Sequence, residues 1–412
     1  MHNVVIVGAG PAGLSAAIAA AAAGAPVLLI DSNPRLGGQY WRLPADNFGD
    51  QHNQHFDLDT GLLLINAVKD RKEIEIYSGA QIWSATHKDG INTLRVLHNG
   101  VEKIINTGNL ILCTGAYDRA LPFPGWDIPG VMTPGGVQSL LKGHGVLAGK
   151  KVVVAGSGPF LLPVAAGVIK AGGEVVELLE ANKSYRWLLS PFVLLENVGK
   201  VKEAFYYIKT ISEAKLRARF GQAVVAAHKG SDGSLESVDV ATIGRKFKVK
   251  KIRNVKCNVA AVGWGFTADT SLAGALGCKQ SVAKDDGVVV VADQDQQSSI
   301  PGIFVAGEIT GIGGSELSMA EGVIAGISAA KFVGCKVEVL KAHRKRRAKK
   351  QRFASALIKS YPIKAGWISW LNGQTVVCRC EEVTVDNLKY AIEELGATDS
   401  RTAKLLTRCG MG

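Results

Sequence analysis

Three glycines near the start of the chain have the spacing of a turn that binds the pyrophosphate of a dinucleotide. Gly8, Gly10 and Gly13 form a G-x-G-x-x-G pattern. In this pattern the first glycine permits a tight turn, the second lets the backbone approach the phosphates, and the third lets the following helix pack closely on the strand. Asp31 follows at close to the spacing of about 20 residues at which an acid binds the ribose. Together these residues predict a dinucleotide-binding site rather than a glycine turn without nucleotide.

The elements that must position these residues are expected in the right order. Residues 4–7 are β-branched and suit a strand that is buried on both faces. A helix over residues 12–23 would present its N-terminus to the phosphates, and Gly24 and Pro26 would end it. A second strand over residues 27–30 then delivers Asp31 to the ribose.

Three further segments resemble the FAD-binding domain of flavoproteins that have two dinucleotide domains. Residues 31–42 contain a second glycine pair, Gly37-Gly38, and residues 109–116 are an apolar strand ending in Thr114-Gly115. Residues 300–308 resemble the second FAD motif, in which the acid after Ala-Gly meets the ribityl chain; here that acid is Glu308 instead of the commoner Asp. The resemblance favours FAD over NAD and assigns to it Gly8, Gly10, Pro11, Ala12, Gly13, Asp31, Ser32, Arg35, Gly38, Gln39, Thr114, Gly115, Gly307 and Glu308.

The strand and glycine turn occur a second time, starting at residue 151. Gly156 and Gly158 repeat the first two glycines, and Glu180 takes the place of Asp31. Leu161 replaces the third glycine, so we expect helix and strand to pack less closely in this copy. If a second nucleotide binds at Gly156, Gly158 and Glu180, the acid favours an unphosphorylated ribose over that of NADP. NAD, ATP and a second FAD all remain compatible with the sequence.

Between these motifs the sequence indicates further elements. We expect a polar loop over residues 45–60, a helix over 61–69, and an antiparallel meander over 74–77, 81–86, 93–97 and 101–105, with hairpin turns at Asp89-Gly90 and Asn99-Gly100. Prolines and glycines crowd residues 122–136, which marks a domain crossing. The aromatic-rich residues 184–220 are predicted to be helical and to pack in a core, or to face a subunit or the flavin. Strands are expected over 223–227, 237–243 and 259–263.

Composition places the chain among globular proteins of two or three domains. It has 412 residues, of which 47% are hydrophobic and 20% charged. The longest apolar run, residues 14–30, contains Gly24 and Pro26 and falls short of the ~18–20 unbroken residues of a membrane span. The first strand starts too early for a signal peptide, so the expected compartment is the cytoplasm.

The net charge of +12 has a local origin. Eight Lys and Arg residues lie between Lys341 and Arg352 without an acid among them. This run is compatible with a solvated helical linker, with docking on an acidic partner subunit, or with contact to nucleic acid or a membrane surface. The linker is the preferred interpretation, and we expect no nucleic-acid partner.

Cys378 and Cys380 form a C-x-C pair near the end of the sequence. Two thiolates one residue apart can bind one iron, and an iron–sulfur cluster takes four such ligands. The segment resembles the 2Fe-2S domain of the bacterioferritin-associated-ferredoxin type, whose second cysteine pair would fall after Gly412, so the cluster site is expected to be incomplete in this sequence. Structural zinc is the alternative. The remaining cysteines are too scattered for a disulfide framework.

Taken together, these segments resemble the α subunits of opine oxidases, hydrogen cyanide synthase and the dye-linked proline or hydroxyproline dehydrogenases. The most specific parts of the resemblance are residues 117–125 and the C-x-C pair. It implies an FAD-dependent electron-transfer subunit of an amino- or imino-acid dehydrogenase or oxidase, in which a separate flavoprotein β subunit oxidises the substrate. The alternative is a self-contained NAD(P)H-dependent flavin reductase that uses the Gly156 site and passes electrons to a protein acceptor.

The same residues exclude a thiol relay, because no C-x-x-C pair occurs in the sequence. No catalytic residue is assigned, since Tyr117 and His144 are only weak proton-transfer candidates. The predicted fold class is α/β, with two Rossmann-like domains in the layout of the disulfide reductases. We expect an FAD domain over residues 1–118 and 282–332, an inserted second nucleotide domain over 119–281, a basic linker over 333–371, and a truncated 2Fe-2S segment over 372–412.

Overall fold

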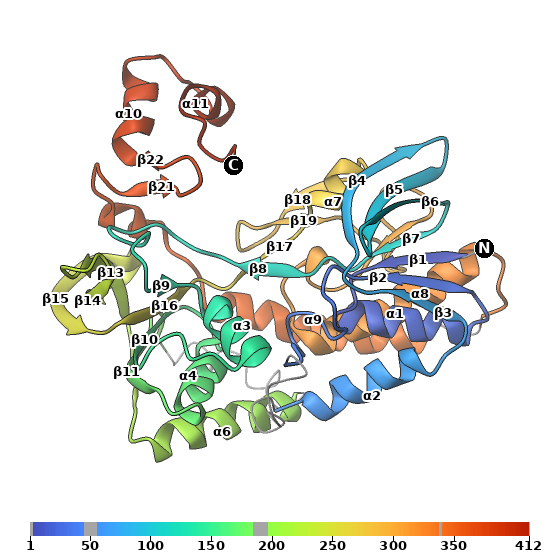
Figure 1. Ribbon diagram of the computed structural model, residues 1–412, viewed down its shortest axis with the longest axis horizontal. Helices are drawn as coiled ribbons and strands as arrows, with labels where there is room; N and C mark the ends of the chain where they lie inside the picture. Colours follow the sequence, from blue (N-terminus) through green and yellow to red (C-terminus); the bar gives the residue numbers. More distant parts are fainter. Residues whose placement is uncertain (1–2, 45–55, 184–196, 338–339, 412) are drawn as a thin grey trace.

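The computed structural model describes residues 3–44, 56–183, 197–337 and 340–411. It contains two parallel sheets that belong to two units side by side, and a small C-terminal segment (Figure 1). The α/β class with two Rossmann-like units is therefore confirmed. The aromatic residues predicted at 185, 187 and 192, and most of the polar loop predicted over 45–60, lie outside the described residues.

The first sheet has the order β20-β7-β1-β2-β3, and all its strands are parallel. Its strands are β1 (Val4–Val7), β2 (Val27–Ile30), β3 (Ile74–Tyr77), β7 (Leu110–Leu112) and β20 (Ile303–Val305). The strand β3 was expected in the meander, and that prediction is wrong: it pairs with β2 from Val27↔Ile74 to Ile30↔Tyr77. Strict alternation in a four-residue segment does not distinguish a sheet edge from a hairpin.

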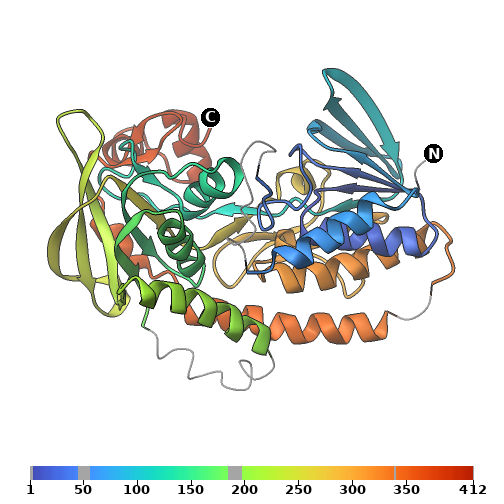
Figure 2. The same ribbon diagram turned by 60° about the horizontal axis from the view of Figure 1, so that its bottom comes forward.

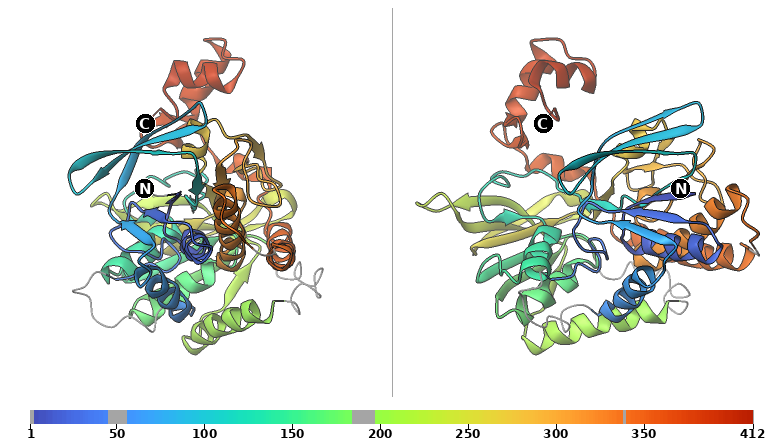
Figure 3. Two further views of the ribbon diagram at one scale, coloured as in Figure 1. Left: turned by 90° about the vertical axis from the view of Figure 1, so that its right-hand side faces the viewer. Right: turned by 45° about the vertical axis from the view of Figure 1, so that its right-hand side comes forward.

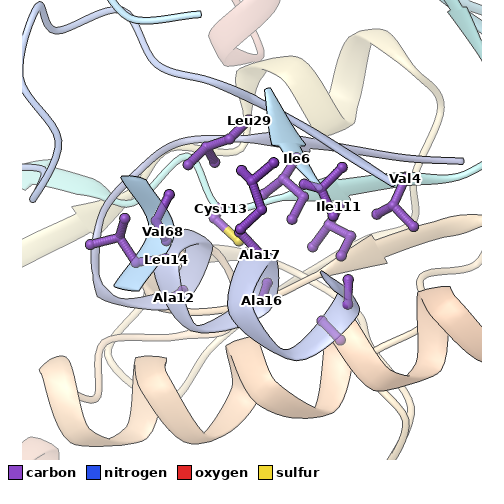
Figure 4. Packing of buried hydrophobic residues seen from close by; sticks show 14 of the residues in the cluster. Val4, Ile6, Ala12, Leu14, Ala16, Ala17, Leu29, Val68, Ile111 and Cys113 are labelled. Atoms are coloured by element: carbon purple, nitrogen blue, oxygen red, sulfur yellow. The ribbon is translucent and has the colours of Figure 1, made fainter. Parts of the chain in front are cut away.

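Two helices pack closely on one face of this sheet. Alanines of α1 (Pro11–Ala22) lie between the strands and α8 (Ser315–Phe332), as Figure 4 shows for Ala12, Ala16 and Ala17. A Cβ on Gly322 would lie 2.1 Å from the carbonyl oxygen of Ala12, and one on Gly326 would lie 2.3 Å from that of Ala16. The two helices are therefore in backbone contact, which fixes the position of the α8 N-terminus.

The second sheet has the order β12-β11-β10-β16-β9. It consists of β9 (Val131–Met132), β10 (Lys151–Gly156), β11 (Glu174–Glu180), β12 (Ala218–Phe220) and β16 (Val259–Gly263). The helices α3 (Pro134–His144), α4 (Leu161–Lys170) and α6 (Val198–Glu213) accompany it, as does an antiparallel sheet of β13 (Gln222–Lys229), β14 (Leu235–Ile243) and β15 (Val249–Lys256). The strand β15 was not predicted.

The chain crosses between the units through a short antiparallel pair, β8 (Ala116–Asp118) with β17 (Phe266–Ala268). After β17 come α7 (Ser271–Ala275), β18 (Gln280–Val282) and β19 (Val288–Val290). Ala273, Leu276 and Cys278 belong to the same core cluster as Val5 and Leu28 of the first unit. We therefore propose that the first unit resumes near residue 271, earlier than residue 282.

The remaining first-unit elements are α2 (Leu58–Lys69), which packs beside α1, and a separate antiparallel sheet of β4 (Gln81–Lys88), β5 (Ile91–His98) and β6 (Val101–Thr107). This sheet is the predicted meander without β3. Among the helices of the described residues, none combines the length and apolar character that a membrane crossing needs.

The basic run forms the helix α9 (Lys341–Ser360), which runs along both units (Figure 2). It packs against α8 and is therefore not a solvated linker over its whole length. The C-terminal segment follows with a 3-10 helix (Ala365–Trp370), β21 (Val376–Cys378), β22 (Val383–Thr384), α10 (Val385–Glu393) and α11 (Ser400–Thr407). It protrudes from the second unit (Figure 3), to which the indole N–H of Trp370 attaches it by donating to the Phe247 carbonyl at 3.1 Å.

Candidate dinucleotide-binding sites

A cavity of about 1960 Å³ lies between the two units. Its lining includes Gly10 and Asp31 of the first unit and Gly158 and Glu180 of the second. These residues follow the carboxyl ends of parallel strands, where open α/β sheets bind their ligands. Since a drug-sized ligand occupies ~300–1,000 Å³, the cavity is large enough for an extended dinucleotide together with a second ligand.

The first glycine turn combines two packing glycines with one that faces the cavity. Gly8 has φ +98°, and its Cβ would lie 2.2 Å from the Cys113 carbonyl oxygen; a Cβ on Gly13 would lie 1.7 Å from the Gly8 oxygen. At Gly10 the nearest atom to a Cβ would be the Gly38 Cα, 4.0 Å away. The space beside Gly10 is therefore open. The helix α1 begins at Pro11 without a side-chain cap, so its first N–H groups are available to an anion.

Asp31 is 6% exposed and lies at the lining of the cavity. Its carboxylate accepts hydrogen bonds from the backbone N–H of Ala9 at 2.5 Å and of Asn33 at 2.7 Å. One acid therefore connects the glycine turn with the loop that follows β2. This arrangement fixes the carboxylate at the position where the sequence predicts the ribose.

Glu308 lies at the opposite end of the first unit's chain but lines the same cavity. Its carboxylate accepts from the backbone N–H groups of Gly313 at 3.1 Å and Gly314 at 2.7 Å. Burial raises the pKa of Glu308 to about 7, although these two hydrogen bonds act in the opposite direction. The longer Glu side chain thus fits here by binding the loop in front of α8.

A buried polar network behind Glu308 was not predicted. Glu321 is 1% exposed and accepts from the backbone N–H of Gly307 at 3.0 Å and from the Thr310 hydroxyl at 2.8 Å. Arg347 of α9 donates to the other Glu321 oxygen at 3.0 Å. Burial raises the pKa of Glu321, and the Arg347 charge partly opposes that rise. The basic helix therefore supports the second predicted FAD motif.

The second glycine turn repeats the arrangement with a different acid. A Cβ on Gly156, which has φ +134°, would lie 1.7 Å from the Gly263 oxygen. The Glu180 carboxylate accepts from the backbone N–H groups of Gly158 and Asn182, both at 2.8 Å. Burial raises the pKa of Glu180 to about 7. Leu161 is 4% exposed and packs into the core at the first position of α4.

Most of the predicted cofactor residues line this one cavity. They are Gly8, Gly10, Pro11, Ala12, Asp31, Ser32, Gly38, Gln39, Thr114, Gly115, Gly158, Glu180, Gly307 and Glu308. The other three, Gly13, Arg35 and Gly156, do not line it. Of the weak proton-transfer candidates, Tyr117 lines the cavity and is 57% exposed, whereas His144 is exposed and does not line it.

The cysteine pair lies in the C-terminal segment. The Sγ atoms of Cys378 and Cys380 are 3.2 Å apart, and the backbone N–H of Gly410 donates to Cys378 Sγ at 3.1 Å. This hydrogen bond is the largest of the effects that lower the pKa of the Cys378 thiol to about 7. Within the described ranges, no group of three or more His, Cys, Asp or Glu residues is arranged to hold a metal ion. The described residues thus offer two ligands of a four-ligand site.

Comparison with protein families gives a match over most of the chain. The profile of the family described as pyridine nucleotide-disulphide oxidoreductase matches residues 2–330. One of the subunits of the opine oxidase of Agrobacterium tumefaciens is 30% identical over 436 residues, which span 100% of this chain and 82% of that protein. The hydrogen cyanide synthase subunit HcnB of Pseudomonas protegens is 31% identical over 432 residues, which span 100% of this chain and 88% of that protein.

Solved structures share the fold. The L-proline dehydrogenase of P. horikoshii superposes with a TM-score of 0.69 at 19% identity, covering 100% of this chain and 70% of that one. The thioredoxin reductase of T. acidophilum superposes with a TM-score of 0.57 at 20% identity, covering 81% of this chain and 97% of that one. Both agree with the layout of two dinucleotide-binding units.

Proposed function

Because the chain belongs to the pyridine nucleotide-disulphide oxidoreductase family, and is an FAD-dependent oxidoreductase of the opine oxidase and HcnB type, we propose that it is the electron-transfer subunit of a heteromeric amino- or imino-acid dehydrogenase or oxidase. The observation that carries this proposal is the match over the whole chain to two kinds of protein that are named as subunits. Its partner would be a flavoprotein β subunit that oxidises the amino or imino acid.

The residues of the first unit fit FAD. The open space beside Gly10 and the uncapped start of α1 suit the pyrophosphate. Asp31 would bind the ribose of the adenosine, and Glu308 the ribityl chain. When bound, FAD supplies the electron-accepting chemistry. The residues of this chain hold and orient it, and the glycines allow the backbone to come close.

Substitution of Gly10 by Val tests this assignment. A Cβ at Gly10 meets no atom of the chain closer than 4.0 Å, so the Gly10→Val chain should still fold. The added side chain would occupy the space assigned to the pyrophosphate, and we expect at least a 100-fold loss of FAD affinity, equivalent to about 2.7 kcal/mol. Absorbance near 450 nm measures bound FAD, and circular dichroism measures folding. A folded variant that retains stoichiometric FAD would contradict the assignment.

The second unit is proposed to bind a nucleotide through Gly156, Gly158 and Glu180. Gly158 and Glu180 line the same cavity as the first-unit residues, which also supports the alternative function of an NAD(P)H-dependent flavin reductase. The acid at the ribose position favours NAD or ATP over NADP. A second FAD remains a candidate.

The sulfur pair is proposed to hold one iron of a 2Fe-2S cluster. Two thiols 3.2 Å apart, one of which has a lowered pKa, have the chemistry of thiolate ligands. The other two ligands must come from outside the described residues. Iron and acid-labile sulfide analysis tests this on the chain joined to any sequence that follows it; one zinc and no sulfide would contradict it.

Anaerobic reduction of the purified FAD-containing chain discriminates the two functions. The electron-transfer proposal predicts no bleaching of the flavin with glycine, proline, hydroxyproline or an opine, and none with NADH or NADPH. Rapid bleaching with NADH would establish the reductase instead. Bleaching by an amino acid without a partner would contradict the division of labour between subunits.

A further inference from the structure

Two cationic side chains from different units meet in the cavity. Arg42 belongs to the loop that follows Gly38 in the first unit, and Lys142 lies near the end of α3 in the second unit. The contact between them is close, because a Cβ on Gly143 would lie 3.2 Å from Arg42 Cδ and 3.7 Å from Arg42 Nη1. Both side chains line the cavity, so the seam between the units carries two positive charges.

Neither cation has a carboxylate partner among the described residues. Arg42 donates to the side-chain oxygen of Gln39, which is neutral. The acid that contributes to the electrostatics of Lys142 is Glu203, and Glu203 already forms an ion pair with Lys200 at 2.7 Å. The local arrangement therefore has an excess of positive charge that the described protein groups do not neutralise.

The surroundings make this excess costly. Burial lowers the pKa of Lys142 to about 8, and the Arg42 charge acts in the same direction. Burial also lowers the pKa of Arg42. Like charges that are partly removed from water destabilise each other, and an anion between them would reverse the sign of that interaction.

The neighbouring groups suit a small organic anion. The Tyr40 ring lies on the first-unit side, with the Lys200 amine 5.9 Å from its centroid, and both line the cavity. Gln138, one turn before Lys142 on α3, is 6% exposed and lines the cavity; its side-chain oxygen has no hydrogen-bond partner among the described groups. The site thus offers two cations, an aromatic wall and an unused acceptor.

We propose that Arg42 and Lys142 bind the anionic group of a small molecule, a carboxylate or a phosphate, across the seam between the two units. The guanidinium can donate two parallel hydrogen bonds to such a group, and the lysine adds a point charge. A ligand bound here contacts both units at once. This proposal depends neither on the identity of the second nucleotide nor on the iron–sulfur cluster.

Chemical protection of Lys142 tests the proposal on the unmodified FAD-containing chain. An amine with a pKa of about 8 reacts readily with acetic anhydride at pH 8, and mass spectrometry measures its acetylation. The probes are inorganic pyrophosphate and ADP as phosphates, and glycine and L-proline as carboxylates. We expect at least one probe to slow the acetylation of Lys142 about 5-fold or more, and to do so saturably. Exposed Lys341 is the internal control, at which no probe should have an effect.

Variants then identify the groups and the source of the anion. Arg42→Gln and Lys142→Gln should weaken the protecting probe about 10- to 100-fold, measured by flavin absorbance changes, and Lys341→Gln should not. If only ADP acts and Glu180→Gln abolishes its effect, the anion is a phosphate of the second nucleotide; if glycine or proline acts, it is a carboxylate. The proposal fails if none of the four probes protects Lys142, or if Arg42→Gln and Lys142→Gln both leave the affinity of the protecting probe unchanged.

Discussion

The two glycine turns share a layout but differ in where their helix begins. In the first unit α1 begins three residues after Gly8, whereas in the second α4 begins five residues after Gly156. Gly13 is therefore the third helical residue and faces the Gly8 carbonyl, but Leu161 is the first residue of its helix and turns into the core. The comparison teaches that the third glycine is required where the helix begins early and is dispensable where the turn is two residues longer.

The units also differ in what stabilises the carboxylate side of each site. In the first unit, α8 is in backbone contact with α1, and Arg347 of α9 reaches the buried Glu321. In the second, the Glu180 carboxylate relies on two backbone N–H groups, while Asn182 also donates to the hydroxyl of Ser157 at 2.8 Å. The first site is thus tied to elements more than 300 residues away in the chain, and the second depends on local contacts.

Exchanging the third residue between the turns should have the largest effect. In Gly13→Leu the new Cβ would lie 1.7 Å from the Gly8 carbonyl oxygen, so α1 cannot keep its place on β1. We expect a loss of unfolding free energy above about 4 kcal/mol and no bound FAD, measured by urea unfolding and flavin absorbance.

The matched exchange is Leu161→Gly in the second unit. It leaves a cavity in the core and places glycine in a helix, so it should cost about 3–5 kcal/mol while FAD remains bound. If Gly13→Leu retained FAD and its stability, the role of helix start in the comparison would be wrong.

Loss of the long-range tie should come next. Arg347→Ala leaves Glu321, which is 1% exposed, as a buried acid without its cation, and breaking such a pair costs about 3–5 kcal/mol. Arg344→Ala is the matched control, because its pair with Asp295 is about one-third exposed on both sides and should contribute about 0–1 kcal/mol. Equal melting temperatures of the two variants would contradict the proposed support of the first site by α9.

The sequence alone predicts the local parts of this comparison. The β-branched runs, glycine turns and following acids determine β1, β2, β10 and β11, since each depends on neighbouring residues with a known period. The position of Leu161 was misjudged because the length of a turn is set by where the helix first satisfies its hydrogen bonds. That cannot be read from glycine spacing.

The long-range parts could not be predicted for a different reason. Arg347 is one of eight similar cations in a run, and only the packing of α9 on α8 places it beside Glu321. Glu321 itself lies in a helix where an acid is usually exposed. The meeting of Arg42 with Lys142 likewise depends on how the two units sit together, and no spacing encodes it.

The smallest expected effect separates the acid of the second site by its titration. The pKa of Glu180 is about 7 in the folded chain, against an ordinary value of about 4.5. The folded chain therefore binds a proton that the unfolded chain has already released between these two values, so the contribution of Glu180 to stability falls as the pH rises from about 4.5 to about 7 and is constant above that.

Glu180→Gln should remove this part of the pH dependence. For the unmodified chain we expect the unfolding free energy to fall by roughly 1–3 kcal/mol per such group between pH 5 and pH 7.5. Glu308 has a pKa of about 7 for the same reason and titrates in both proteins, so the variant should retain a decline of about half the size. Urea unfolding at pH 5, 6, 7 and 7.5 measures both curves, and only their difference bears on Glu180. Parallel curves would mean that its carboxylate does not titrate in this range, and the contrast between a locally held second site and a remotely supported first site would then rest on the packing of α9 alone.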